Sequence, residues 1–259
     1  MSIRTMQRRD VDAVLAMLQT SFDPSLVRYL THTQHGARAF LESLLDNHTL
    51  IPSIDLSVAT GEDDEPLAFA EFSQQGDSAH LSYVCVSEHS RRQGMATALI
   101  DAYVGDHVPT VVSLDVFAEN VPALRLYEKH GFQVRAEYVW ARRSLPGASA
   151  RAILNNPLDS IAMHTLYGFC TLNSDVAGAT VRVGWIGDEV LRCYDVASFR
   201  DDAFLSSMRA TVPTTTEAFV IVPPEEGLNA LPADAEVLTR ALRLERSYPS
   251  GAASDGGRP

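Results

Sequence analysis

Over the first 145 positions, some segments have an apolar residue at every second position or in a short run, and others have them three and four positions apart. The first pattern predicts strands and the second predicts helices, so strands and helices are expected to follow one another. A short strand is expected at 3–6. The helix after it carries its apolar residues three and four positions apart, at Val11, Val14, Leu15 and Leu18. Residues 26–46 form a second helical region, which Gly36 can interrupt. This part of the chain therefore begins as a strand followed by two helical segments.

The following positions predict more strands, the later ones separated by helices. In chain order these elements are strands 56–60 and 67–73 around the acidic turn 61–66, strand 81–86, helix 96–104, strand 111–117, a helix after Asn120 and strand 134–144. Helices that each have one apolar face must bury it against a sheet or another helix. The pattern thus predicts an α/β fold, with a mixed central sheet flanked by helices.

A small, turn-rich segment at 145–150 marks a boundary between domains. Beyond it we expect strands 180–186 and 189–194, helix 198–211, strand 217–222, a short helix at 228–237 and strand 238–246. The sequence therefore predicts one domain at 1–145 and a smaller α+β domain at 151–246. Residues 247–259 are rich in Ser, Gly and Pro and are predicted to be a disordered tail.

The composition limits the class of protein. A chain of 259 residues with 46% hydrophobic positions suits two folded units, and it contains no apolar run long enough to cross a bilayer. We expect a soluble, cytoplasmic protein without a membrane partner. Three widely spaced cysteines (Cys85, Cys170 and Cys193) argue against disulfides or a zinc site, so no metal is expected. The net charge of −12 argues against a nucleic-acid partner and is compatible with an amine substrate.

The residues after strand 81–86 carry the clearest chemistry. Arg91 and Arg92 supply positive charge, and Gly94 and Ala96 leave space beside the first turn of the next helix. The first N–H groups of a helix have no intrahelical partner and carry partial positive charge. The turn is therefore predicted to hold an anionic group such as a pyrophosphate.

Two motifs in this order resemble the GNAT superfamily of N-acetyltransferases. The first is Arg91-x-x-Gly94-x-Ala96. The second is N-x-x-A-x-x-x-Y-x-x-x-G-F, which runs here from Asn120 through Tyr127 to Phe132. In the second motif Asn120 suits a helix N-cap and Gly131 a left-handed C-terminal residue. The resemblance covers slightly more than half of the chain and implies one GNAT fold over 1–145.

The resemblance implies acetyl-CoA as the cosubstrate. In this family the coenzyme strand splays from its neighbour, so that backbone groups at Val84 and Val86 pair with the pantetheine arm and polarise the acyl carbonyl. The pyrophosphate is expected on the amides from Arg92 to Thr97. The expected coenzyme-binding set is Val84, Cys85, Val86, Arg91, Arg92, Gln93, Gly94, Met95, Ala96, Thr97 and Asn120. Tyr127 matches the family position that protonates the departing sulfur.

The general base that deprotonates the amine is less defined. We predict His80, near the start of the coenzyme strand, because an imidazole can accept a proton near neutral pH. Strict alternation would place His80, Ser82, Val84 and Val86 on one face. A surface role for His80 is equally compatible with the sequence. Glu71 is a second candidate, Asp115 could anchor the amine, and a water chain could replace a single base.

A covalent route through Cys85 is a competing hypothesis, because this thiol lies within the coenzyme strand. It would require a thiol with a lowered pKa, whereas a buried strand cysteine usually acts as a small apolar side chain. Direct attack by the amine in a ternary complex is therefore favoured. His164 and Tyr167 form no recognisable catalytic group and are expected to be structural.

The element order of 180–246 resembles the second half of another GNAT unit, but its turn at 194–200 has no glycine. We favour a degenerate repeat that does not bind coenzyme, and an unrelated accessory domain is the alternative. The predicted activity is transfer of an acetyl group from acetyl-CoA to a primary amine of a small molecule. The alternatives are an acetyltransferase acting on a protein or peptide amine and a non-catalytic acyl-CoA-binding protein. A homodimer is also compatible with the sequence.

Overall fold

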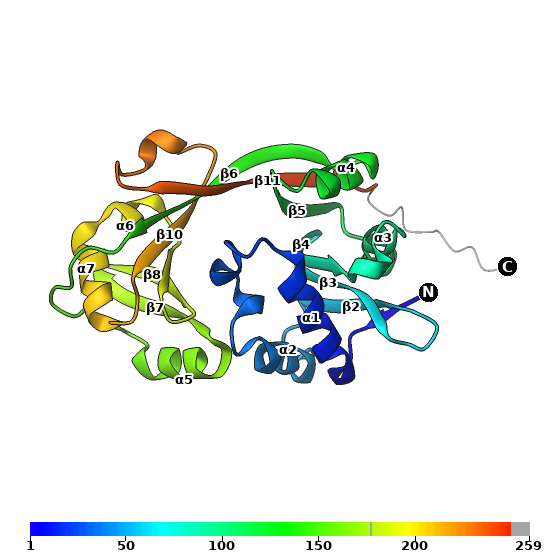
Figure 1. Cartoon of the computed structure of the whole chain (residues 1–259), viewed down its shortest axis with the longest axis horizontal. Coiled ribbons are helices and arrows are strands. Elements are labelled where there is room, and N and C mark those ends of the chain that lie inside the picture. Colours follow the sequence, from blue (N-terminus) through cyan, green and yellow to red (C-terminus); the bar gives the residue numbers. More distant parts are fainter. Residues whose placement is uncertain (177, 250–259) are drawn as a thin grey trace.

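The computed structural model describes residues 1–176 and 178–249, which form two α/β units joined by one continuous sheet (Figure 1). Within these residues the sheet has 11 strands, in the order β1-β2-β3-β4-β5-β11-β6-β10-β9-β8-β7. The described residues contain no helix long and apolar enough to cross a membrane. Most of the predicted disordered tail, from residue 250 onward, lies outside the described residues.

The N-terminal unit has the predicted order of strands and helices. Its strands are β1 (Ser2–Thr5), β2 (Ile54–Thr60), β3 (Pro66–Gln75), β4 (Ser78–Val86), β5 (Val111–Phe117) and β6 (Gln133–Ser144). Its helices are α1 (Val11–Ser21), α2 (Ala37–Asp46), α3 (Met95–His107) and α4 (Val121–Lys129). The expected helical region 26–46 divides into two 3-10 turns and α2, with Gly36 as the N-cap of α2. The predicted α/β fold with a mixed sheet flanked by helices is confirmed.

The C-terminal unit contains elements that the sequence pattern did not reveal. Its elements are α5 (Pro157–Tyr167), β7 (Phe169–Val176), β8 (Ala179–Ile186), β9 (Val190–Cys193), α6 (Val196–Arg200), α7 (Asp202–Thr211), β10 (Glu217–Val222) and β11 (Glu236–Ser247). Helix α5 and strand β7 were not predicted. The expected helix 198–211 is two helices, because Asp201 caps α7 through its side chain.

The prediction of a short helix at 228–237 is wrong. Only Leu228–Ala230 forms a 3-10 turn, and β11 already begins at Glu236. The reason is tertiary, because residues 236–242 pair with residues 137–142 of β6. A pairing partner more than 90 positions away cannot be read from local periodicity.

The two halves of the sheet repeat one connectivity around its centre. Strand β4 pairs in parallel with β5, and β5 pairs antiparallel with β11. In the other half β9 pairs in parallel with β10, and β10 pairs antiparallel with β6. A helical segment connects each parallel pair, namely α3 in one half and α6 with α7 in the other. This repetition supports the interpretation of the C-terminal unit as a degenerate copy.

Helices cover both faces of the N-terminal half. On one face α1 and α2 pack on β2 and β3 through a buried cluster around Leu18, Leu41 and Phe69. On the other face α3 and α4 pack on β3, β4 and β5 through a cluster around Leu99 and Leu114. The C-terminal half has its own core, centred on Phe199 and Leu205 of α6 and α7. Each unit therefore has a separate hydrophobic core.

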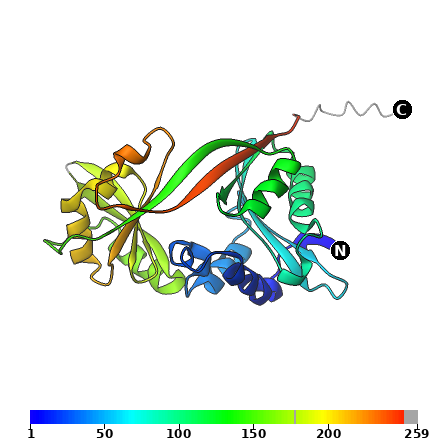
Figure 2. The same ribbon diagram turned by 45° about the horizontal axis from the view of Figure 1, so that its top comes forward.

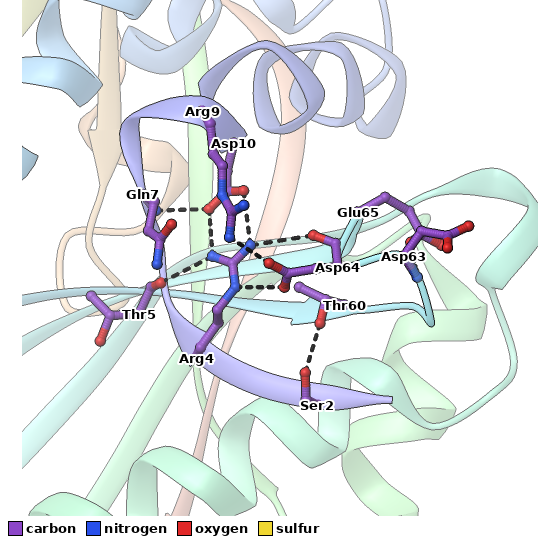
Figure 3. A network of polar contacts seen from close by, with 10 residues as sticks. All are labelled: Ser2, Arg4, Thr5, Gln7, Arg9, Asp10, Thr60, Asp63, Asp64 and Glu65. Carbon is purple, nitrogen blue, oxygen red and sulfur yellow. Dashed lines mark hydrogen bonds and ion pairs between the residues drawn. The ribbon is translucent and has the colours of Figure 1, made fainter.

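A polar network fixes the N-terminal strand to the β2–β3 turn (Figure 3). The Arg4 guanidinium donates to both oxygens of Asp10, at 2.6 and 3.0 Å, and its Nε donates to Asp64 at 2.9 Å. Asp10 is buried and also accepts from the Gln7 backbone N–H. A buried carboxylate needs such charged and hydrogen-bonded partners. The acidic turn therefore serves to hold Arg4 in this part of the fold.

Besides the packing of Leu26 and Tyr29 against the cluster around Phe219, the two units meet at two places. Strands β6 and β11 cross from one unit to the other as a long antiparallel pair (Figure 2). The second contact is between α2 and α5, where Phe40 packs edge-on against Tyr167 and Phe169. At Gly36 an added Cβ would lie 2.3 Å from the Leu166 carbonyl oxygen. Only glycine fits at this contact, because backbone atoms of α5 occupy the space.

We expect Gly36→Ala to lower the free energy of unfolding by about 1–3 kcal/mol, because the added methyl group forces α2 and α5 apart. Chemical denaturation measures the change. Gly105→Ala is the matched control, since a Cβ there meets no atom within 4 Å. In a helix that substitution is expected to stabilise by about 0.5–1 kcal/mol. Equal stability of Gly36→Ala and the wild type would contradict the tight α2–α5 contact.

Candidate active site

The strands β4 and β5 separate halfway along β4. Their parallel pairing starts at Ser78–Val111 and ends at Leu81–Leu114. The second half of β4, from Ser82 to Val86, pairs only with β3. The splay implied by the family resemblance is therefore present. It leaves backbone groups of β4 and β5 without a sheet partner at the point where the two strands diverge.

A β-bulge lies at the start of the splay. In the register with β3, Leu81 lies opposite Phe72 and Tyr83 lies opposite Glu71, so Ser82 is an extra residue. An extra residue reverses the alternation of side chains along the strand. The bulge therefore changes which β4 side chains share a face.

The prediction that His80 and Val84 share one face is wrong for this reason. Val84 and Val86 pack toward the α3 and α4 side, whereas Tyr83 packs toward α1 and α2. In the register with β3, His80 lies on the same side as Tyr83. Simple alternation holds on each side of Ser82 but not across it.

Two cavities adjoin the splay. One, of about 590 Å³, lies beside α4 and is lined by Val84, Asn120, Ala123 and Tyr127; we call it the α4-side cavity. The other, of about 560 Å³, lies between the two units and is called the inter-unit cavity. The residues that line both cavities come mostly from the two splayed strands and are Phe22, Ser82, Tyr83, Asp115, Val116 and Phe117. The splay thus connects the two cavities.

The turn before α3 has the backbone geometry of an anion site. Gly94, with φ +80°, is the N-cap of α3, and Arg92 also has a positive φ of +65°. Among the hydrogen bonds between described residues, none is donated by the backbone N–H groups from Arg92 to Thr97. The side chains from Arg91 to Gln93 are exposed. Unpaired N–H groups at a helix N-terminus can bind a phosphate.

The other side chains of the turn fix its shape. Arg91 donates from Nε to the Val86 carbonyl at 3.3 Å, and Gln93 donates to the His89 carbonyl at 3.2 Å. Thr97 donates from Oγ1 to the Gly94 carbonyl at 2.8 Å. Met95 is buried in the core beneath α3, and Ala96 is partly exposed. Met95 therefore anchors the turn to the core.

Helix α4 brings two predicted site residues to the α4-side cavity. The Asn120 side chain accepts from the Ala123 N–H at 3.3 Å and caps the helix, as expected, and Gly131 has φ +82°. Tyr127 lines the cavity, and its ring packs edge-on against Phe132. Burial raises the pKa of the Tyr127 hydroxyl well above its ordinary value. The hydroxyl is therefore protonated at neutral pH and can donate a proton.

His80 lines the inter-unit cavity, on the opposite side of the splay from Tyr127. Its Nδ1 lies 3.0 Å from Ser113 Oγ, and its Nε2 lies 3.9 Å from Asp115 Oδ2. Burial lowers the pKa of His80, Asp115 opposes that shift, and Arg243 adds to it. The imidazole is thus neutral at pH 7 and can accept a proton.

The other predicted bases differ in their surroundings. Asp115 lines both cavities, but Arg243 donates to both of its oxygens, with Nη2–Oδ2 at 2.8 Å. Glu71 is buried away from both cavities and lies 2.7 Å from His32 Nε2. Glu71 therefore has no access to a bound amine, and its carboxylate serves the packing of His32 beneath Tyr83.

Cys85 lies on the face away from the α4-side cavity, where its thiol packs against residues of α1 and α2. Burial raises its pKa to about 12. A nucleophilic thiol requires the opposite shift, so the structure argues against the covalent route. His164 and Tyr167 are buried structural residues: His164 stacks on Trp185, and Tyr167 packs against Phe40.

Sequence reasoning missed the residues that form the far wall of the inter-unit cavity. Trp140 of β6, Arg192 and Tyr194 at the end of β9, and Arg243 of β11 line it together with His80. These positions belong to no motif. Their signal lies in the pairing of β11 with both β5 and β6, which brings distant parts of the chain together.

Comparisons with known proteins agree with this geometry. Residues 16–132 match the family described as Acetyltransferase (GNAT) family. No curated protein matches the chain. Among solved structures, a protein from Pyrococcus horikoshii provisionally named an acetyltransferase has a TM-score of 0.60 at 13% identity, with 96% of this chain and 90% of that chain covered.

Two proteins from Thermoplasma acidophilum are also similar. One, provisionally named an acetyltransferase, has a TM-score of 0.53 at 14% identity, with 96% of this chain and 100% of that chain covered. The other is an N-acetyltransferase solved in complex with coenzyme A. Its TM-score is 0.45 at 15% identity, and the match covers 52% of this chain and 90% of that chain. The two long matches share the fold of both units. The family match and the splayed sheet together identify residues 16–132 as a GNAT acetyltransferase domain.

Proposed function

We propose that this acetyltransferase transfers the acetyl group of acetyl-CoA to a primary amine of a small molecule, by direct attack in a ternary complex. The observation that carries the proposal is the splay of β4 and β5, where two cavities meet and share lining residues. A thioester held on one side can then meet an amine held on the other. Such positioning supplies a large part of the rate enhancement in two-substrate reactions.

The residues of the α4 side fit the coenzyme. The unpaired N–H groups from Arg92 to Thr97 suit the pyrophosphate, and the exposed guanidinium groups of Arg91 and Arg92 add positive charge. The free edge of β4 around Val84 suits the amide groups of a pantetheine arm. The α4-side cavity then leads the thioester to the splay, beside Tyr127.

The reaction needs two proton transfers, and we assign them to two residues on opposite sides of the splay. His80 accepts a proton from the amine in the inter-unit cavity. The amine nitrogen bonds to the acetyl carbon, the carbon–sulfur bond breaks, and Tyr127 donates its proton to the departing sulfur. The acid and the base act on different atoms, so their separation by the sheet suits the reaction.

The C-terminal unit is proposed to serve the acceptor rather than a second coenzyme. At the turn after β9 the Asp195 side chain caps α6, accepting from the Ser198 N–H at 2.6 Å. A carboxylate already occupies the place where a pyrophosphate would need free N–H groups. The unit instead lines the inter-unit cavity, which favours a small acceptor over a protein N-terminus.

Tyr127→Phe tests the proposed chemistry through the release of free thiol from acetyl-CoA in the presence of small primary amines. The wild type is expected to release thiol only with an acceptor. The variant is expected to lose roughly 10²-fold or more in kcat, because the leaving sulfur has no proton donor. Its affinity for acetyl-CoA, measured by calorimetry, should stay close to that of the wild type.

Tyr103→Phe is the matched control for this variant. Tyr103 is also buried, and burial also raises its pKa, to about 12, but it lines neither cavity. Its kcat should stay within about twofold of the wild-type value. An undiminished kcat in Tyr127→Phe would eliminate the tyrosine as the acid.

The pH dependence of kcat/KM tests His80. The imidazole accepts a proton only when neutral, so activity should fall as pH drops through its pKa, which lies below the ordinary 6.5 because of burial. His80→Ala should lose this acidic limb, whereas His107→Ala, remote on α3, should keep it. If kcat/KM of His80→Ala still falls at acidic pH as in the wild type, another group accepts the proton.

A further inference from the structure

The far wall of the inter-unit cavity carries a cation that the proposed reaction does not use. Arg192 is in β9 of the C-terminal unit and lines the cavity. Its guanidinium lies over the Tyr194 ring at 5.2 Å and over the Phe219 ring at 5.8 Å. Aromatic faces hold a guanidinium in a defined orientation and leave its N–H groups available at the edge.

Within residues 1–176 and 178–249, no carboxylate forms a salt bridge with Arg192. The other arginine of the cavity, Arg243, is paired with Asp115 through two hydrogen bonds. The two arginines therefore differ in whether a carboxylate of the protein pairs with them. Arg243 is neutralised by the protein, whereas Arg192 presents its charge to the cavity.

The backbone makes room for this side chain. Gly184 of β8 lies opposite Arg192 in the sheet. A Cβ added there would lie 3.1 Å from Arg192 Cβ and 3.2 Å from the Tyr194 hydroxyl. Any larger residue at 184 would push both side chains from their positions, so the glycine preserves the arrangement of Arg192 on Tyr194.

The charge of Arg192 reaches the splayed strands. Burial raises the pKa of Tyr83, and the charge of Arg192 is one of the smaller effects that oppose this shift. Tyr83 lines both cavities at the point where β4 and β5 diverge. A ligand in the inter-unit cavity therefore has both aromatic walls and this guanidinium available to it. The walls include Tyr29, Tyr138 and Trp140.

We infer that the acceptor is a primary amine with an apolar or aromatic body and a carboxylate, and that Arg192 binds this carboxylate. The inference rests on the proposed function, since it assigns the acceptor of the same site. Both ends of such a molecule find a partner, the amine near His80 and the carboxylate at Arg192. A guanidinium suits a carboxylate because its two N–H groups match the two oxygens.

The test compares amines that differ only in a carboxylate at the far end of an aromatic body: 4-(2-aminoethyl)benzoate with phenethylamine, and 4-(aminomethyl)benzoate with benzylamine. Thiol release from acetyl-CoA gives kcat/KM for each amine. In at least one pair the wild type should prefer the carboxylate-bearing amine by about 10- to 100-fold. Arg192→Gln should remove most of that preference, and Arg192→Lys, which keeps the charge but not the planar fork, should retain only part of it.

Arg182→Gln is the control, because Arg182 also lies near the Tyr194 ring, at 5.5 Å, but does not line the cavity. It should keep the wild-type preference. Acetylation of both members of each pair at equal rates, or a preference that survives in Arg192→Gln, would overturn the inference and leave the proposed function in place. Absence of thiol release with every amine would overturn the proposed function itself.

Discussion

The end of the β4–β5 pairing at Leu81 and Leu114 governs the chemistry of this molecule. Parallel strands normally exchange hydrogen bonds along their whole length, because an unpaired backbone group inside a protein is costly. Here the ladder stops after four residue pairs, and the strands diverge. The edge groups that this leaves unpaired face two cavities, which the sheet would otherwise separate completely.

The remaining elements support this opening. The bulge at Ser82 turns Tyr83 toward the α1 and α2 side of the sheet and Val84 toward the α3 and α4 side. Strands β6 and β11 extend beyond the N-terminal unit and hold the C-terminal unit beside the opening, while the close contact at Gly36 fixes its distance at the other end. The inter-unit cavity is thus bounded by parts of both units.

Much of the N-terminal unit could be predicted because its signals are local. Asn120 and Gly131 are dictated by backbone conformation at helix ends, and each adopts the expected conformation. Helix α5 could not be predicted in this way, because polar side chains lie on its buried face and apolar side chains on its exposed face. It buries Ser160 and His164 and exposes Leu158 and Ile161, so its apolar positions do not mark its inner face.

The inter-unit cavity could not be predicted from local sequence patterns for a different reason. Its wall combines β4, β5, β9 and β11, and Arg192 and His80 are 112 positions apart in the numbering. Only the strand order, with β11 inserted between β5 and β6, brings such residues to one cavity. Likewise, the bulge at Ser82 depends on its pairing with β3, and the sequence of β4 gives no sign of it.

The central claim is that a thioester and an amine meet through the splay while both are bound. Initial rates of thiol release, measured while acetyl-CoA and the amine are varied together, test it most directly. Direct attack in a ternary complex predicts double-reciprocal lines that intersect. Parallel lines, which indicate an acetyl-enzyme intermediate, would contradict the account, because the only thiol on β4, that of Cys85, is buried with a pKa raised to about 12.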